Sequence, residues 1–424
     1  MQRRVNDLGE RVEFTKDMRE DYTILAPNML TLHFNFIEKA FRDSGYKVKV
    51  LKNAGRAVVD TGLKYVHNDT CYPALLVIGQ FIDALLSGDY DVNKVALMIT
   101  QTGGGCRASN YIHLLRKALK KAGLEQVPII SLNFAGMEKN SGFKLTLPLI
   151  KKMIAGIAYA DFFMLLKNQI IPYEKNIGET EKLINSWTDK MLAEFRKGKG
   201  VSLADIRKNI NIMVKDFADI QMQKKDLVKV GVVGEIYIKY SSLGNNNLEE
   251  FLHSQNCEYM VPGLMGFLLY NVENQLENIN LYGGSKVKYI IVKKARDYFI
   301  KIEKAINDAI KSCNKFTVPG DFFHLKSLVK DVVSFGNKMG EGWLLTAEML
   351  ELCEQGFDNI VCAQPFGCLP NHIVGKGMIR KIKEKFPQSN IVAIDYDPGA
   401  TKVNQENRIK LMLAVGKDKK EGSL

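Results

Sequence analysis

The stretch Cys-Ala-Gln-Pro-Phe-Gly-Cys-Leu-Pro-Asn-His, at 362–372, places two thiols, Cys362 and Cys368, in one turn. It follows a short apolar run at 357–361 with the pattern of a buried strand, and it precedes a predicted helix at 373–385. In an open α/β sheet, ligands bind where strand ends and helix starts converge. The prolines and the glycine favour an irregular turn whose N–H groups can face an anion or cluster sulfurs. The stretch predicts an α/β fold with a metal or iron–sulfur site.

A second strand, glycine turn and cysteine occur earlier in the chain. A buried strand is predicted at 95–100, followed by Gln-Thr-Gly-Gly-Gly-Cys-Arg-Ala-Ser-Asn and a helix at 111–122. The turn matches neither the Walker loop nor the dinucleotide fingerprint. Its glycines let the backbone approach whatever Cys106 holds and supply a nest of N–H groups; these cofactor-binding candidates are Gly103, Gly104 and Gly105.

Cys71 lies at the predicted start of a third helix, at 74–86. N-cap candidates at 67–70 and Pro73 in the first turn support that start. A helix amino end favours a thiolate, which suits a metal ligand or a nucleophile. Taken alone, Cys71 is explained equally well as a buried structural residue.

The composition indicates a multi-domain globular protein. With 424 residues, 46% of them hydrophobic and 25% charged, two or three domains are expected. The chain has no uncharged apolar run of 18 residues and no signal peptide at its start, so we expect a cytoplasmic protein without a membrane partner. The net charge of +12 comes from dispersed lysines without interleaved aromatic residues, so no nucleic-acid partner is expected.

Alternating strand and helix patterns predict Rossmann-like or flavodoxin-like parallel-sheet domains with a helical insert. We expect an α/β domain at 1–140 that contains Cys71 and Cys106. A helical bridge at 141–225 follows, and a second α/β region at 226–424 contains Cys362 and Cys368.

The seven cysteines do not indicate a disulfide framework, because a cytosolic chain rarely has one and an odd number cannot all pair within one chain. Thiolates are soft ligands for zinc or an iron–sulfur cluster. Structural zinc sites use closely spaced cysteine pairs, which this chain lacks. The metal-ligand candidates, Cys71, Cys106, Cys362 and Cys368, fit a cluster between domains better.

Glu341 lies between two glycines ahead of an expected helix that ends near Glu354. Its carboxylate has two interpretations. It could stabilise the helix amino end, or it could act as a catalytic acid.

Five passages, at 68–73, 101–111, 340–345, 364–372 and 394–399, resemble the C-terminal part of large proteins related to 2-hydroxyacyl-CoA dehydratase activases. That part is similar to the iron–sulfur subunits of the dehydratases and to double-cubane cluster proteins. The resemblance covers about residues 20 to 415. It implies a 4Fe–4S cluster or an 8Fe–9S double cubane between Rossmann-like units. It also implies a partner, an ATP-hydrolysing activase with its own 4Fe–4S cluster, and pairing as a homodimer.

The resemblance implies Cys71, Cys106 and Cys368 as the first ligands, with Cys362 as a fourth. A double cubane would need further thiols, from a second subunit or from Cys257, Cys313 or Cys353. The implied function is reduction of a small molecule with electrons from the activase. Alternatives are dehydration of a 2-hydroxyacyl-CoA, a non-catalytic electron carrier or cluster scaffold, and a plain α/β binding module with zinc or no metal.

Overall fold

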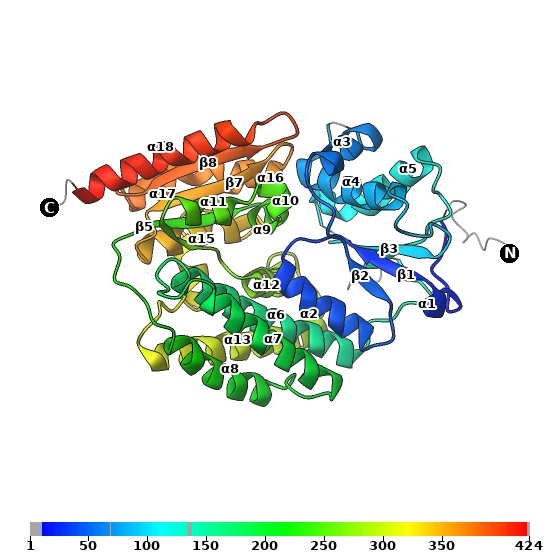
Figure 1. Ribbon diagram of the computed structural model, residues 1–424, viewed down its shortest axis with the longest axis horizontal. Coiled ribbons are helices and arrows are strands. Elements are labelled where there is room, and N and C mark those ends of the chain that lie inside the picture. The colour runs from blue at the N-terminus through cyan, green and yellow to red at the C-terminus, as the bar shows by residue number, and fades with distance from the viewer. Residues whose placement is uncertain (1–10, 68, 103, 134–137, 422–424) are drawn as a thin grey trace.

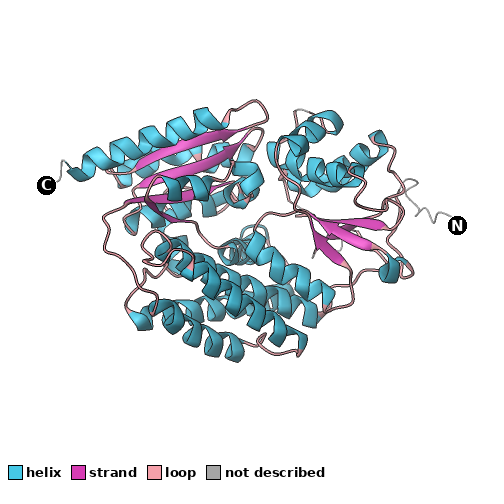
Figure 2. Cartoon of the chain, viewed as in Figure 1, coloured by secondary structure: helices cyan, strands magenta, loops and turns pink. Residues whose placement is uncertain are grey.

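Two parallel sheets and a layer of helices make up the chain. The computed structural model describes residues 11–67, 69–102, 104–133 and 138–421. In Figure 1 the first α/β unit lies at the upper right, the second lies at the upper left, and the helical layer runs beneath both. The predicted α/β class with parallel sheets is confirmed (Figure 2).

The first unit has four parallel strands in the order β2-β1-β3-β4. Parallel neighbours need crossover connections, and helices provide them here. The strands are β1 (Thr23–Ala26), β2 (Val48–Val50), β3 (Val95–Thr100) and β4 (Ile129–Leu132). The helices are α1 (Met18–Asp21), α2 (Thr31–Arg42), α3 (Arg56–Tyr65), α4 (Tyr72–Leu86), the short 3-10 helix η1 (Arg107–Asn110) and α5 (Tyr111–Lys121).

The second unit repeats this order as β6-β5-β7-β8, again all parallel. Its strands are β5 (Val228–Gly234), β6 (Cys257–Met260), β7 (Asn359–Pro365) and β8 (Asn390–Tyr396). Its helices are α9 (Ile236–Tyr240), α10 (Ser242–Asn245), α11 (Leu248–Ser254), α15 (Gly342–Glu354), α16 (Leu369–Val374), the 3-10 helix η2 (Lys376–Met378), α17 (Ile379–Lys385) and α18 (Lys402–Glu421).

One strand differs from its predicted bounds. β7 continues to Pro365, four residues beyond the expected end at 361, so Cys362 lies inside the strand. Residues 360–365 are all buried. The apolar run therefore does not stop at Cys362, because thiol and alanine side chains pack as small hydrophobic groups.

The helical layer combines two distant parts of the sequence. The predicted bridge supplies α6 (Leu147–Ile170), α7 (Glu179–Arg196) and α8 (Leu203–Ala218). Between β6 and β7 the chain adds α12 (Leu264–Tyr282), α13 (Lys286–Cys313) and α14 (Phe322–Val329). Helix α13 packs on α8, and α12 packs on α6, so the second unit contributes helices to the layer that carries both sheets.

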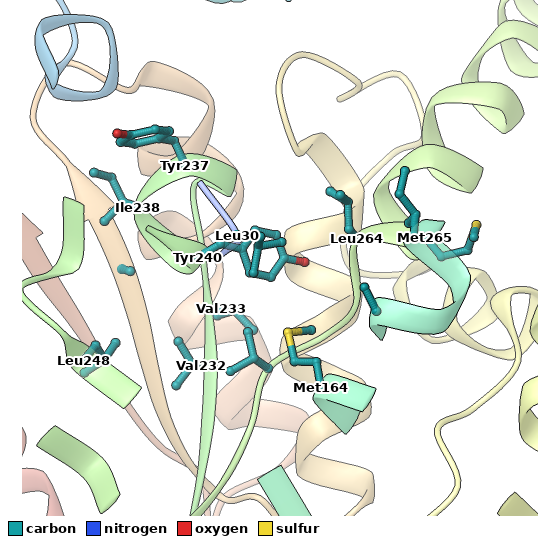
Figure 3. Close-up of a cluster of buried hydrophobic side chains, with 14 of the residues drawn as sticks. Leu30, Met164, Val232, Val233, Tyr237, Ile238, Tyr240, Leu248, Leu264 and Met265 are labelled. Carbon is teal, nitrogen blue, oxygen red and sulfur yellow. The ribbon is translucent and has the colours of Figure 1, made fainter. Parts of the chain in front are cut away.

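The three parts share one hydrophobic core. Figure 3 shows Leu30, which precedes α2, close to Met164 of α6, Val233 of β5 and Leu264 of α12. All four side chains are buried. Because burial of apolar surface is the main favourable term in folding, this shared core joins the units into one body.

A buried carboxylate crosses the same junction. Asp161 of α6 accepts hydrogen bonds from the N–H groups of Leu264 and Met265, at 2.8 and 2.7 Å, at the start of α12. Its Oδ1 also lies 2.7 Å from Nε2 of His33, on α2. One side chain thus caps a helix amino end and holds a second helix.

We expect Asp161→Ala to lower the free energy of unfolding by about 3 kcal/mol, because it leaves two buried N–H groups and an imidazole without their acceptor. Urea unfolding followed by circular dichroism measures this change. Asp161→Asn keeps one acceptor oxygen and should lose less. Equal stability of Asp161→Ala and wild type would contradict this role.

Candidate functional site

Three of the predicted thiols lie at equivalent local positions, each at the residue just before a helix. Cys71 precedes α4, Cys106 precedes η1, and Cys368 precedes α16. Cys106 follows β3 and Cys368 follows β7, at the carboxyl edges of the two sheets. This edge is where parallel α/β sheets bind ligands.

The turn before Cys368 touches Cys71 directly. The N–H of Tyr72 donates to the carbonyl of Phe366 at 3.0 Å. A Cβ atom added to Gly367 would lie 3.0 Å from the Cα of Cys71, and the φ of Gly367 is +73°. Glycine is therefore required here both for the backbone conformation and for the close approach of the two units.

Cys106 belongs to the same group of thiols. Burial raises the pKa of its thiol to about 11, and the negative charges of Glu341, Glu235 and Cys71 add to the rise. The pKa of Cys368 is also raised, first by burial and then by Glu341, Glu235 and Cys106. The three thiols are thus close enough to act on one another electrostatically.

Cys71 shows that burial outweighs the helix dipole. The sequence predicts a favoured thiolate at the start of this helix, whereas burial raises the pKa of the Cys71 thiol. The hydroxyl group of Tyr111, 3.0 Å from the sulfur, offsets part of the rise. All three thiols are therefore neutral near pH 7 without a ligand, and metal binding must displace their protons.

Two buried acids border the three thiols. Glu341, the predicted catalytic residue, does not bond to the start of its own helix, α15. Its Oε1 instead accepts the N–H of Ile236 at 2.9 Å. Glu235, directly after β5, caps α9 by accepting the N–H of Ile238 at 2.9 Å. The sequence analysis missed Glu235, although an acid directly after a buried strand was a usable signal.

Both acids are held toward their neutral forms. Burial raises the pKa of Glu235, and the nearby charge of Glu341 adds to the rise. Burial likewise raises the pKa of Glu341. Lys239 lies close enough to oppose both shifts, but its ammonium already pairs with Glu348 at 3.2 Å. The site therefore contains two buried carboxyl groups whose neutral, protonated forms are favoured by burial.

Cys362 lies inside strand β7 and not at the start of a helix. It is fully buried in β7, and its Sγ is 4.0 Å from Oδ1 of Asn371, on the covering helix α16. A Cβ atom on Gly375 would lie 3.1 Å from the same sulfur. Burial raises the pKa of Cys362 to about 12. The structure thus packs Cys362 into the core of the second unit.

The remaining thiols lie in other elements. Cys257 begins the edge strand β6, Cys353 is buried in α15, and Cys313 ends α13 with its thiol donating to the carbonyl of Ile310. Within the described residues, no recorded contact joins them to the group of Cys71, Cys106 and Cys368. The described structure therefore gives no support for Cys257, Cys313 or Cys353 as the additional ligands that a double cubane would need.

The glycine turn is only partly described, since Gly103 lies outside the described residues. The N–H of Gly104 donates to the hydroxyl of Ser109 at 2.9 Å. The N–H of Gly105 donates to the sulfur of Met339 at 3.2 Å. The N–H of Gly104 therefore stabilises the turn from within, and the N–H of Gly105 binds the turn to the loop that leads to Glu341.

Among the described residues, no group of three or more His, Cys, Asp or Glu side chains is arranged to hold a single metal ion. No described helix is long and apolar enough to cross a membrane. No model of a known protein family matches the chain, and a search of curated proteins finds no match. The resemblance to the 2-hydroxyacyl-CoA dehydratase superfamily therefore stays a prediction from its motifs.

We expect Gly367→Ala to destabilise the protein more than Gly356→Ala. Both glycines have a positive φ, but an added Cβ would meet nothing within 4 Å at Gly356. The left-handed conformation costs about 1 kcal/mol for alanine in either case. The contact with Cys71 should add at least about 1 kcal/mol at Gly367. Urea unfolding of both variants tests this difference, and equal losses would show that the two units do not meet at this turn.

The Cys106 thiol should react slowly with iodoacetamide in the metal-free, anaerobic protein. Because burial raises its pKa to about 11, the thiolate fraction at pH 8 is about 100-fold lower than for an ordinary cysteine. The rate should rise about tenfold per pH unit to beyond pH 9. Peptide mass spectrometry measures it, with urea-unfolded protein as the control. A plateau below pH 9 would contradict the raised pKa.

Proposed function

We propose that this protein holds an iron–sulfur cluster between its two α/β units, on Cys71, Cys106 and Cys368. In this proposal it accepts low-potential electrons from an ATP-dependent activase and reduces a small molecule. The supporting observation is that three thiols from distant parts of the sequence gather where the carboxyl edges of two parallel sheets meet. A structural role alone does not require three neighbouring cysteines at this edge.

The donor set fits a cluster better than a single ion. Thiols are the usual ligands of iron–sulfur clusters. Each ligand binds a different iron of a cluster, so the sulfurs lie farther apart than the ligands of one zinc ion. A cluster site therefore need not bring its ligands as close together as a single-ion site does. This agrees with the finding that no group of side chains in the described chain is arranged around a single ion. Cys362, inside β7, is not needed for a set of three ligands.

A bound cluster would supply low-potential one-electron transfer. The residues of this chain would exclude water and handle protons around it. Glu341 and Glu235 are buried beside the thiols with raised pKa values, so either can hold a proton. Since reduction of many small molecules consumes protons as well as electrons, we assign Glu341 the role of catalytic acid and Glu235 a supporting role.

The electron donor would be a separate protein. The turn around Cys106 has neither the Walker loop nor the dinucleotide fingerprint, so ATP hydrolysis is assigned to the activase partner. Low-potential clusters are sensitive to oxygen, which favours an anaerobic cytoplasm as the place of action. The same cluster would also serve a dehydratase or a non-catalytic carrier, and turnover with activase and ATP would separate an enzyme from a carrier.

Iron and acid-labile sulfide, measured on anaerobically purified protein, test the proposal. Wild type should contain about four irons per chain for a 4Fe–4S cluster and about eight for a double cubane. Dithionite reduction should produce an EPR signal. Cys368→Ala should lose most of the iron, whereas Cys313→Ala, in the last turn of α13, should keep it.

Two outcomes would overturn the proposal. Iron absent from wild type under anaerobic reconstitution would leave a plain α/β binding protein. Full iron and an unchanged EPR spectrum in Cys368→Ala would show that a cluster, if present, is bound elsewhere.

A further inference from the structure

The turn between α12 and α13 exposes large apolar side chains. We call residues 278–296, which contain the end of α12 and the start of α13, the hairpin tip. Its five apolar side chains that are each more than half exposed are Leu281, Tyr282, Val287, Ile290 and Ile291. They lie on both sides of the turn at Gly283 and Gly284. A contiguous patch of exposed apolar side chains indicates a contact surface, whereas isolated exposed apolar residues are common on protein surfaces.

The apolar side chains of α13 form a stripe that faces away from the protein. Val287, Ile290 and Ile291 are spaced by three and four residues and so share one face of the helix. Tyr289 and Val292, on the other side, are half-buried where α13 packs on α12. The buried residues of α13 begin only at Phe299. Packing within the described chain therefore does not explain the stripe.

The hairpin tip is strongly basic. It contains no Asp or Glu, and its cations are Lys286, Lys288, Lys293, Lys294 and Arg296. Arg296 pairs with Glu273 and Asp297. The four lysines are exposed, and none has an ion pair among the described residues. By helical position, Lys288 lies on one side of the apolar stripe, Lys286 and Lys293 lie on the other, and Lys294 ends the stripe one turn further along its own face.

We propose that the hairpin tip docks on an anionic lipid surface. An apolar stripe flanked by lysines is the pattern of helices that lie in the headgroup region of a membrane. Each lysine near an anionic leaflet contributes about 1 kcal/mol of attraction. A second copy of this chain is disfavoured as the occupant because four lysines would face four lysines. This inference does not depend on the proposed cluster.

Surface docking is distinct from the spanning segment that the sequence argues against. The expectation that no membrane is a partner rests on the absence of long apolar runs, and a short exposed stripe escapes such a search. The stripe is too short to anchor a protein alone, so we expect reversible binding that needs both the apolar side chains and the lysines.

The hairpin tip is connected to the candidate site. Lys338 donates to Oδ1 of Asn278, and its ammonium lies 4.6 Å from the ring centroid of Tyr282. The next residue, Met339, accepts the N–H of Gly105. Docking would therefore place lipid headgroups beside the loop that borders the thiols, and this protein would act at a membrane surface.

Co-sedimentation of the purified full-length protein with vesicles tests the proposal. Vesicles of phosphatidylcholine with about 30 mol% phosphatidylglycerol should bind the protein, and pure phosphatidylcholine should not. Raising the salt from about 0.05 to 0.5 M should release it. Lys288→Glu with Lys293→Glu should weaken binding at least about tenfold.

Ile290→Ser with Ile291→Ser should also weaken binding. This loss would show that apolar side chains enter the lipid layer, since charge attraction by the lysines alone would leave binding unchanged. These residues are exposed, so circular dichroism should show unchanged folding. The matched control is Lys208→Glu with Lys215→Glu on α8, where both lysines are exposed and the effect should be small. Equal loss in the control pair, or no vesicle binding by wild type, would overturn the proposal and leave an acidic protein as the occupant.

Discussion

The close approach of the two sheets at the turn before Cys368, where the N–H of Tyr72 donates to the carbonyl of Phe366, brings the two halves of the site together. In a parallel sheet, every strand ends at the same edge, so each unit has one edge at which turns, helix starts and polar groups collect. Here the two edges face each other. Residues that are hundreds of positions apart become neighbours, and the thiols and acids of the site depend on this approach of the two edges.

The close approach of the two edges also explains the electrostatics. Thiols and carboxyl groups at the end of a single open sheet would face water and ionise near their usual pKa values. Between two units they lose water, and the charged form becomes unfavourable for both kinds of group. The dipole at the start of α4 acts in the opposite direction at Cys71, but it is the weaker effect. The result is a group of thiols and acids whose neutral, protonated forms are favoured.

The sequence predicted those parts of the structure that depend on local pattern. The strand, glycine turn and helix around Cys106 were expected and are present, as is the turn before Cys368. Cys362 was expected in the same turn as Cys368, but β7 extends to Pro365, so Cys362 is buried within the strand. The joining of α12 and α13 to the helices at 147–218 was not foreseen, because the partners of a helix far along the chain leave no local signal. Glu235 was missed although it directly follows a buried strand, since its importance lies in its neighbours across the site.

The identical strand order of the two units has a consequence for the symmetry of the site. β3 and β7 occupy the same position in their sheets, and each is followed by a turn with a cysteine before a helix, Cys106 in one unit and Cys368 in the other. These two thiols are thus counterparts in the topology of the two units, whereas Cys71 has no counterpart in this pattern. The two halves of the site are therefore alike in architecture but unequal in chemistry, because the first unit contributes two thiols and the second contributes one thiol and the two acids.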